Sequence, residues 1–204
     1  MLDRAQSPAL TGLWAAKHTT MSADADAERG RRFREAALPH LDDVYTLARY
    51  LLRHKADADD AVQECYLRAL RHFDSYRGPA MKPWLLAILR NVCNAEFARR
   101  AAQRATSVAA RGEENATDEP LWQEPQSSPE TALIRHRDGE TIRRLIAALP
   151  PAFREAVVLR DINNLSYRDI AEVVGVPVGT VMSRLARARS MLRAAWNAEQ
   201  GAAP

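Results

Sequence analysis

Apolar residues recur at spacings of three and four along most of this chain, the pattern of helices that bury one face. The first clear stripe consists of Leu41, Val44, Tyr45, Leu47, Ala48, Leu51 and Leu52. No stretch of convincing length alternates apolar and polar residues as a half-buried strand would. The pattern predicts an all-α protein whose ordered part begins near Arg31, after an N-terminal extension (residues 1–30) that we expect to be disordered.

Two more helices are expected in the first domain, residues 31–104. Asp57 is well placed to cap the second helix, because its carboxylate can accept a hydrogen bond from a free backbone N–H. The segment SYRGPAMKP then breaks the helical period with one glycine and two prolines, which predicts a loop. The third helix is expected to start around Pro83 and Trp84.

Residues 105–131 have a different character, with three prolines in the segment TSVAARGEENATDEPLWQEPQSSPE. Against the single cation Arg111 stand the acidic residues Glu113, Glu114, Asp118, Glu119, Glu124 and Glu130. Little in this stretch could pack in a core, so we interpret it as a flexible acidic linker between two small helical domains. The second domain is expected over residues 132–196, with a tail at 197–204.

The second domain ends in a predicted helix-turn-helix within SYRDIAEVVGVPVGTVMSRLARARSML, residues 166–192. Ser166 and Asp169 have the spacing of a capping box, and Gly175 stands where the chain must turn sharply. The helix that follows carries hydroxyl and guanidinium groups near its start, as reading of the DNA major groove requires. These groups belong to Thr180, Ser183, Arg184 and Arg187.

Composition adds little to this picture. The chain has 29 Lys and Arg against 26 Asp and Glu, a net charge of +3, so the distribution of charge matters more than its sum. Most cations are arginines, which suit phosphate and guanine, although GC-rich coding would produce the same bias. Met21 is a second plausible start besides Met1, and the sequence leaves that choice open.

Several classes of protein are disfavoured. Cys65 and Cys93 lie in no metal-binding spacing and are expected to be buried thiols, with any redox role left open. The sequence contains no nucleophile motif, phosphate-binding glycine loop or close-spaced histidine pair, so we predict no catalytic residue, cofactor or metal site. No secretory signal or membrane span is apparent, which predicts a cytoplasmic protein without membrane insertion.

Two blocks of the chain resemble a known family. ADADDAVQECYLRALRHFDSYRG and PWLLAILRNVCNAEFARR resemble the second conserved region of bacterial RNA polymerase sigma factors, and residues 148–192 resemble the fourth. The other regions of larger sigma factors have no counterpart here, which points to the extracytoplasmic-function (ECF) group. The resemblance implies a subunit that binds core RNA polymerase, recognises a bipartite promoter, assists its opening and starts transcription of a stress- or envelope-type regulon.

The resemblance also implies roles for particular residues. Asp60, Gln63 and Glu64 fall in the block that docks on the β′ clamp helices. The part that reads and melts the minus-ten element corresponds to Tyr76, Arg77, Lys82, Arg90, Asn91, Arg99 and Arg100. Trp84 could stack an extruded base there, but a core position is the favoured interpretation for it.

In the second domain the resemblance assigns reading of the minus-thirty-five element to Thr180, Ser183, Arg184 and Arg187. Met182 replaces a residue that is often basic, so a phosphate contact is absent or the methionine packs on a thymine methyl. Phe153 matches a surface that meets the β flap, although core packing explains it equally well. Members of this group are usually held by an anti-sigma factor, which is therefore an expected partner.

The alternative is a stand-alone helix-turn-helix transcription regulator. Such a protein would need to dimerise in order to read paired half-sites. The first domain shows no sensor pocket or heptad helix that would serve a dimer.

Overall fold

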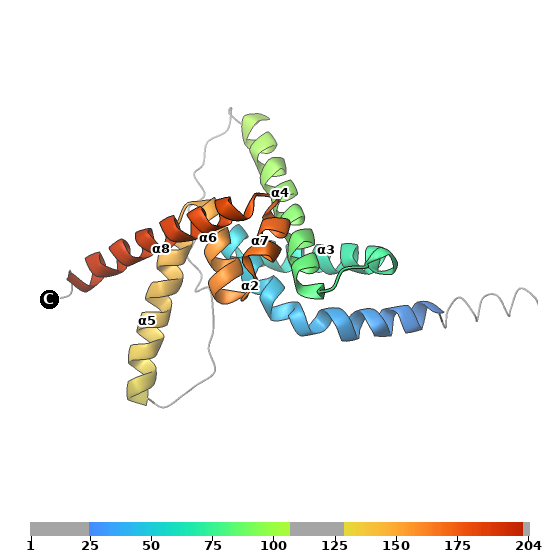
Figure 1. Ribbon diagram of the computed structural model, residues 1–204, viewed down its shortest axis with the longest axis horizontal. Coiled ribbons are helices and arrows are strands. Elements are labelled where there is room, and N and C mark those ends of the chain that lie inside the picture. The colour runs from blue at the N-terminus through green and yellow to red at the C-terminus, as the bar shows by residue number, and fades with distance from the viewer. Residues whose placement is uncertain (1–24, 107–128, 202–204) are drawn as a thin grey trace, which may run out of the picture. The chain divides into compact units, whose positions relative to one another are not determined.

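The computed structural model describes residues 25–106 and 129–201, and over these residues every regular element is a helix, as the sequence predicts (Figure 1). Residues 1–24, most of the expected linker (107–128) and residues 202–204 lie outside the described part. The contacts within the chain divide it into two units, residues 1–39 and 40–204.

The first unit contains a helix over residues 25–37, which begins six residues before the predicted start at Arg31. The helix buries two apolar residues four positions apart, Phe33 and Ala37, and carries exposed ion pairs beside them. The Arg31 guanidinium lies 2.6 Å from Glu28 and 2.7 Å from Glu35, at the three- and four-residue spacings that place side chains on one helix face. Hydrophobic periodicity does not reveal charge pairs of this kind, so it did not predict the first turns of this helix.

The short 3-10 turn η1 (Leu38–His40) ends at the first residue of the second unit. Three helices follow, α2 (Leu41–Leu52), α3 (Lys55–His72) and α4 (Met81–Thr106). The 3-10 turn η2 (Phe73–Ser75) leads into the loop before α4. The three helices pack on one another around a core that includes the fully buried Val44, Leu47, Cys65, Leu85 and Leu89. These are the apolar positions that the helical period selects.

The prediction that Asp57 caps α3 is wrong. His54 precedes the helix and makes no side-chain capping bond, whereas Asp57 lies inside the first turn. Its carboxylate instead lies 2.6 Å from the guanidinium of Arg100 on α4. The first turn still favours an acidic residue through the helix dipole, but a cation distant in sequence determines where this one points.

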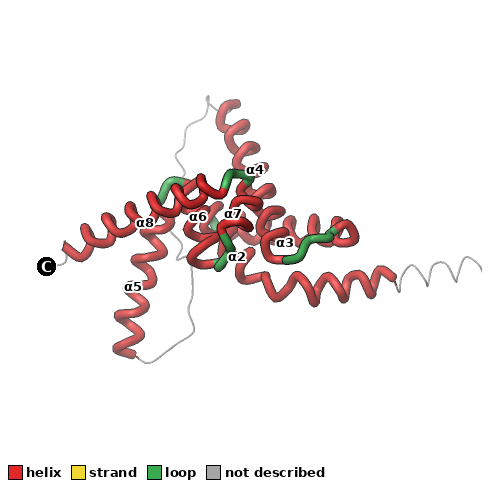
Figure 2. The backbone as a smooth tube through the Cα atoms, viewed as in Figure 1, coloured by secondary structure: helices red, strands yellow, loops and turns green. Residues whose placement is uncertain are grey.

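The chain continues with α5 (Pro129–Ala148), α6 (Pro151–Val157), the π-helical turn η3 (Val158–Ile162), α7 (Tyr167–Val174) and α8 (Val178–Gly201). The predicted capping box is confirmed: Ser166 Oγ accepts from the Asp169 N–H, and the Ser166 N–H donates to the Asp169 carboxylate. Gly175 ends α7 with φ of 68°, the left-handed conformation that favours glycine. Figure 2 shows how short the connection between α7 and α8 is.

Within this unit the two groups of helices are in direct contact. α6 and η3 pack against α2, and α7 packs against α4 (Figure 1). No feature of the sequence indicated this contact, because it joins residues more than 60 positions apart. Over the described residues no helix is long and apolar enough to cross a membrane.

Candidate nucleic-acid and polymerase interfaces

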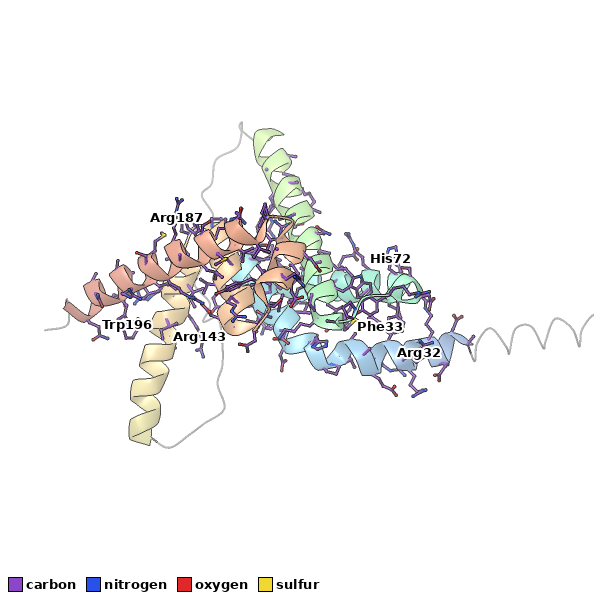
Figure 3. The ribbon with its side chains drawn as sticks, viewed as in Figure 1. Arg32, Phe33, His72, Arg143, Arg187 and Trp196 are labelled. Atoms are coloured by element: carbon purple, nitrogen blue, oxygen red, sulfur yellow. The ribbon has the colours of Figure 1, made fainter. Side chains whose placement is uncertain are left out.

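α8 has one buried and one accessible face near its start. Val181, Leu185 and Ala188 are buried against the rest of the unit. Ser183 and Arg187 are exposed, and Figure 3 shows Arg187 extending away from α8. Thr180 and Arg184 are half-buried beside them, so the structure brings all four predicted reading residues to one side of the helix. Ser183 Oγ donates to the Thr180 carbonyl at 3.0 Å, which orients the hydroxyl.

Two apolar side chains near the start of α8 are also exposed, on the side of the helix opposite Thr180 and Arg187. Met182 is 53 % exposed and Val178 is 40 % exposed. Sequence reasoning singled out Met182 but missed Val178, which stands one helical turn before it. Apolar groups at the start of such a helix can contact thymine methyls in the major groove.

The loop before α4 forms a part-open cavity. The rings of Tyr76 and Trp84 lie 4.7 Å apart, centroid to centroid, at 38°. Trp84 is half-buried, and its ring packs beside Tyr76. Both aromatic residues line a cavity of about 330 Å³, together with Arg77, Pro79 and residues of α7.

Gly78 makes this arrangement possible. A Cβ atom added at Gly78 would lie 2.8 Å from the Tyr76 ring, closer than side chains tolerate. Glycine at this position therefore lets the loop fold back against the tyrosine.

The cations expected to contact the minus-ten strand are paired with carboxylates. Lys82 Nζ lies 2.8 Å from Asp43 of α2. Arg90 Nε donates to Glu155 of α6 at 2.7 Å, and the Glu155 side chain is only 10 % exposed. Both pairs join residues far apart in sequence, so neither could have been predicted from local spacing.

Arg99 and Arg100 share Glu96 on α4. Each guanidinium lies 2.6 Å from the same carboxylate oxygen, and Arg100 also reaches Asp57 at 2.6 Å. Hydrogen bonds from Arg99 and Arg100 lower the pKa of Glu96 to about 2. The spacing of Glu96 to both arginines was visible in the sequence and would have predicted this cluster.

The remaining two predicted minus-ten residues differ from these. Asn91 is exposed on α4. The Arg77 guanidinium donates to the backbone carbonyls of Asp74 and Tyr76, at 2.5 and 2.9 Å, without neutralisation by a carboxylate in those bonds. The Arg77 guanidinium therefore meets backbone carbonyls, not a carboxylate, in these bonds, beside the aromatic cavity that it lines.

The predicted polymerase-docking residues lie on one face of α3. Asp60 and Gln63 are exposed, and Glu64 is half-buried with its carboxylate 2.6 Å from Arg68 Nε. Leu67 continues the same face one turn on and is 43 % exposed. Sequence reasoning missed Leu67, although an apolar residue at this helical spacing from Asp60 and Gln63 was a usable signal.

Both cysteines are fully buried between α3 and α4. Cys65 Sγ donates to the Leu85 carbonyl at 3.4 Å. Burial raises the pKa of both the Cys65 and Cys93 thiols to about 12. They are buried thiols, as predicted.

Two parts of the sequence match known protein families, one in the first half of the chain and one in the second. Residues 37–103 match Sigma-70 region 2 and residues 139–192 match Sigma-70 region 4. The ECF RNA polymerase sigma factor EcfG of Rhodopseudomonas palustris is 37 % identical over 138 residues, which are 67 % of this chain and 70 % of that protein. The chain belongs to the ECF sigma factor family. Members of this family are transcription initiation factors.

Other relatives agree with this assignment. The ECF RNA polymerase sigma-E factor of Escherichia coli K12 is 36 % identical over 67 % of this chain and 72 % of its own length. The ECF sigma factor SigE of Mycolicibacterium smegmatis is 35 % identical over 78 % of this chain, but the match spans only 59 % of that relative. In this sigma factor, region 2 consists of residues 37–103 and region 4 of residues 139–192.

Solved structures have the same fold. The sigma factor RpoE of Bartonella quintana, crystallised with the anti-sigma factor NepR, matches with a TM-score of 0.67 and 26 % identity, over 82 % of this chain and 98 % of that one. CnrH, in complex with the cytosolic domain of CnrY, matches with a TM-score of 0.57 at 23 % identity, over 88 % and 96 %. The second likeness concerns the fold alone.

Proposed function

We propose that this sigma factor acts in the cytoplasm, binds core RNA polymerase, recognises a promoter with two elements and assists its opening. The observation that carries this proposal is that one chain has two surfaces whose chemistry suits two different forms of DNA. The α8 face is suited to duplex DNA, and the Tyr76–Trp84 cavity is suited to an unpaired base. Neither surface alone would distinguish an initiation factor from other DNA-binding proteins.

Region 4 would read the minus-thirty-five element through Thr180, Ser183, Arg184 and Arg187. Arginine can form two hydrogen bonds with a guanine edge, and each such contact contributes about 1–3 kcal/mol of discrimination. Met182 would lie against a thymine methyl, because its exposed thioether side chain offers no charge for a phosphate.

Region 2 would read and melt the minus-ten element. Tyr76 and Trp84 would hold an extruded base, Asn91 would supply an amide on the exposed side of α4, and Arg77 would meet the strand at the cavity rim. Lys82, Arg90, Arg99 and Arg100 would add positive charge along the strand once their carboxylate partners exchange for phosphates.

Core polymerase would dock on the α3 face of Asp60, Gln63 and Glu64, with Leu67 as an apolar contact, and the β flap would meet the region around Phe153. An anti-sigma factor is the expected regulator, because the Bartonella quintana structure holds a sigma factor of this fold together with one. The regulon is proposed to be of the stress or envelope type.

The test is transcription by sigma-free core polymerase from a randomised promoter library, with and without the full chain. Transcripts that require both components, and that share two sequence elements, support the proposal. A chain that binds duplex DNA as a dimer but neither binds core nor directs a transcript would instead be a stand-alone regulator. Asp60→Arg combined with Gln63→Ala should abolish core binding, while Asp59→Asn, one exposed position away, should not.

A further inference from the structure

A part-open cavity of about 480 Å³ is lined by residues of α2, α5 and η3, and it shares no lining residue with the Tyr76–Trp84 cavity. Its volume falls in the range of about 300–1,000 Å³ that is usual for pockets that bind small molecules. Apolar side chains form part of its wall, among them Ile146, Ile162 and Ile142, and the last of these is 46 % exposed. An apolar group bound in the cavity would shield these side chains from water.

Three polar side chains of α2 line the same cavity, and all three are buried. They belong to Thr46, Arg49 and Tyr50, and the last two are 3 % and 8 % exposed. Their spacing of three and four residues places them on one face of the helix. One face of α2 therefore contributes a guanidinium and two hydroxyl groups to the wall of a cavity that is otherwise rich in isoleucine.

The Arg49 guanidinium lacks an acceptor. Its Nε and Nη1 atoms are buried and make no hydrogen bond to any residue that the structure describes. A buried charge of this kind lowers stability, because it has lost its water without gaining a partner. Rotation about the terminal side-chain bonds would bring these donors to a carboxylate in the cavity, and charge-assisted hydrogen bonds of guanidinium to carboxylate are among the strongest in proteins.

Tyr50 supplies a second donor. Over residues 25–106 and 129–201 its hydroxyl donates no hydrogen bond. Burial raises the pKa of the Tyr50 phenol, so the hydroxyl keeps its proton at neutral pH and can donate it to an acceptor. Arg49 and Tyr50 together form a donor pair without an acceptor.

The charges that line the cavity favour an anion over a cation. Besides Arg49, they belong to Arg143, which extends from α5 in Figure 3, and to Asp42 and Asp43. Asp43 already lies 2.8 Å from Lys82, and Asp42 is exposed to solvent. The buried Arg49 is thus the charge that gains most from a ligand of opposite sign.

We propose that this cavity binds a small amphipathic carboxylate, with the anionic head on Arg49 and Tyr50 and the apolar part against Ile142 and Ile146. Both donors would then gain the hydrogen bonds that they lack in the free chain. The inference goes beyond the proposed function, because binding of such a ligand requires neither DNA nor polymerase.

The experiment measures binding of octanoate to the full chain by isothermal titration calorimetry. Octanol, which has the same chain length and no charge, is titrated in parallel. Octanoate is expected to occupy one site and to bind about tenfold or more tightly than octanol, because only the carboxylate can pair with the guanidinium. Equal affinities for the two probes overturn the inference.

Arg49→Met keeps an unbranched side chain of similar length and removes the charge. Octanoate binding should weaken about tenfold or more, and the urea midpoint of unfolding should rise, because an unpartnered buried charge is lost. A lower midpoint with octanoate binding retained would assign Arg49 a structural role and overturn the inference. Arg144→Met is the matched control, since it removes an exposed arginine of α5 that does not line the cavity, and it should leave octanoate binding unchanged.

Tyr50→Phe guards against a folding defect at Arg49, because it removes only the hydroxyl group and keeps the buried ring. It should weaken octanoate binding about fivefold and leave octanol binding unchanged. Octanoate affinity that is unaltered in both Arg49→Met and Tyr50→Phe overturns the inference. Failure of the proposed function is recognised separately, because the chain would then direct no transcript with core polymerase, whatever the calorimetry shows.

Discussion

Arg90 of α4 and Glu155 of α6 are 65 residues apart in the sequence and 2.7 Å apart in the structure. One residue belongs to the proposed minus-ten surface and the other to the helix-turn-helix half of the chain. Most of the Glu155 side chain is inaccessible to solvent, so the pair is screened less than the exposed pairs of the same protein. The contact joins α4 of region 2 to α6 of region 4.

A double-mutant cycle should detect the contribution of the Arg90–Glu155 ion pair to the free energy of unfolding. For alanine at Arg90, at Glu155 and at both, the coupling energy from urea unfolding is expected to be about 1 kcal/mol or more. The exposed pair of Arg189 and Asp161 should give about 0.2–1 kcal/mol. A coupling near zero for Arg90 and Glu155 would mean that this ion pair adds nothing to the stability of the folded chain.

The capping box at the start of α7 should also contribute to the free energy of unfolding. Ser166→Ala removes the acceptor for the Asp169 N–H and should destabilise the protein by about 1 kcal/mol, within a range of 0.5–2. Ser166→Asp keeps an acceptor at the same position and should lose much less. Chemical denaturation followed by far-ultraviolet circular dichroism measures both, and equal losses would argue against a role of the cap.

Prediction of the fold succeeded where the signals were local. Ser166, Asp169 and Gly175 determine the start and end of α7 through backbone geometry within a few residues, and each does what its spacing predicts. Asp57 shows the opposite case. The local sequence predicted that the Asp57 carboxylate would accept a hydrogen bond from a backbone N–H at the start of α3. In the structure it pairs with Arg100 on α4, a partner that the local sequence does not reveal.

The thiols of Cys65 and Cys93 should resist alkylation in the folded protein. Because burial raises both pKa values from 9.0 to about 12, neither forms a thiolate near neutral pH. The unfolded chain loses these protons near pH 9 while the folded one retains them, so stability should fall as the pH rises from about 9 toward 12. Iodoacetamide labelling with and without urea tests the first point, and labelling of the native protein at pH 8 would contradict it.

For the candidate site, too, local spacing was predictable and tertiary contacts were not. Residues on one helix face, such as Ser183 and Arg187, were found because helical spacing determines which side chains share a face. The carboxylates that engage Lys82 and Arg90 were not found, because Asp43 and Glu155 approach them only through tertiary packing. The resemblance to sigma factors indicated which cations could bind DNA but contained nothing about their partners in the free chain.

Trp84 should report binding of the minus-ten strand. If a base stacks in the cavity beside Tyr76, the indole fluorescence should change on addition of the open non-template strand. Trp84→Ala should weaken binding of that strand by about 1–3 kcal/mol and leave duplex minus-thirty-five binding unaltered. Because the chain contains four tryptophans, the measurement compares parent and variant spectra, and identical changes in both would exclude stacking on Trp84.

Promoter selectivity should depend on two arginines of α8. Alanine at Arg184 or Arg187 is expected to cost about 1–3 kcal/mol at the selected promoter and to relax base preference at one position of the minus-thirty-five element. Arg193→Ala is the matched control, since it removes an exposed arginine further along the same helix. Transcription from a library randomised at that element measures both affinity and preference. Retained preference in both Arg184→Ala and Arg187→Ala would remove these residues from the reading face, whereas a uniform loss over all sequences would assign them to phosphates.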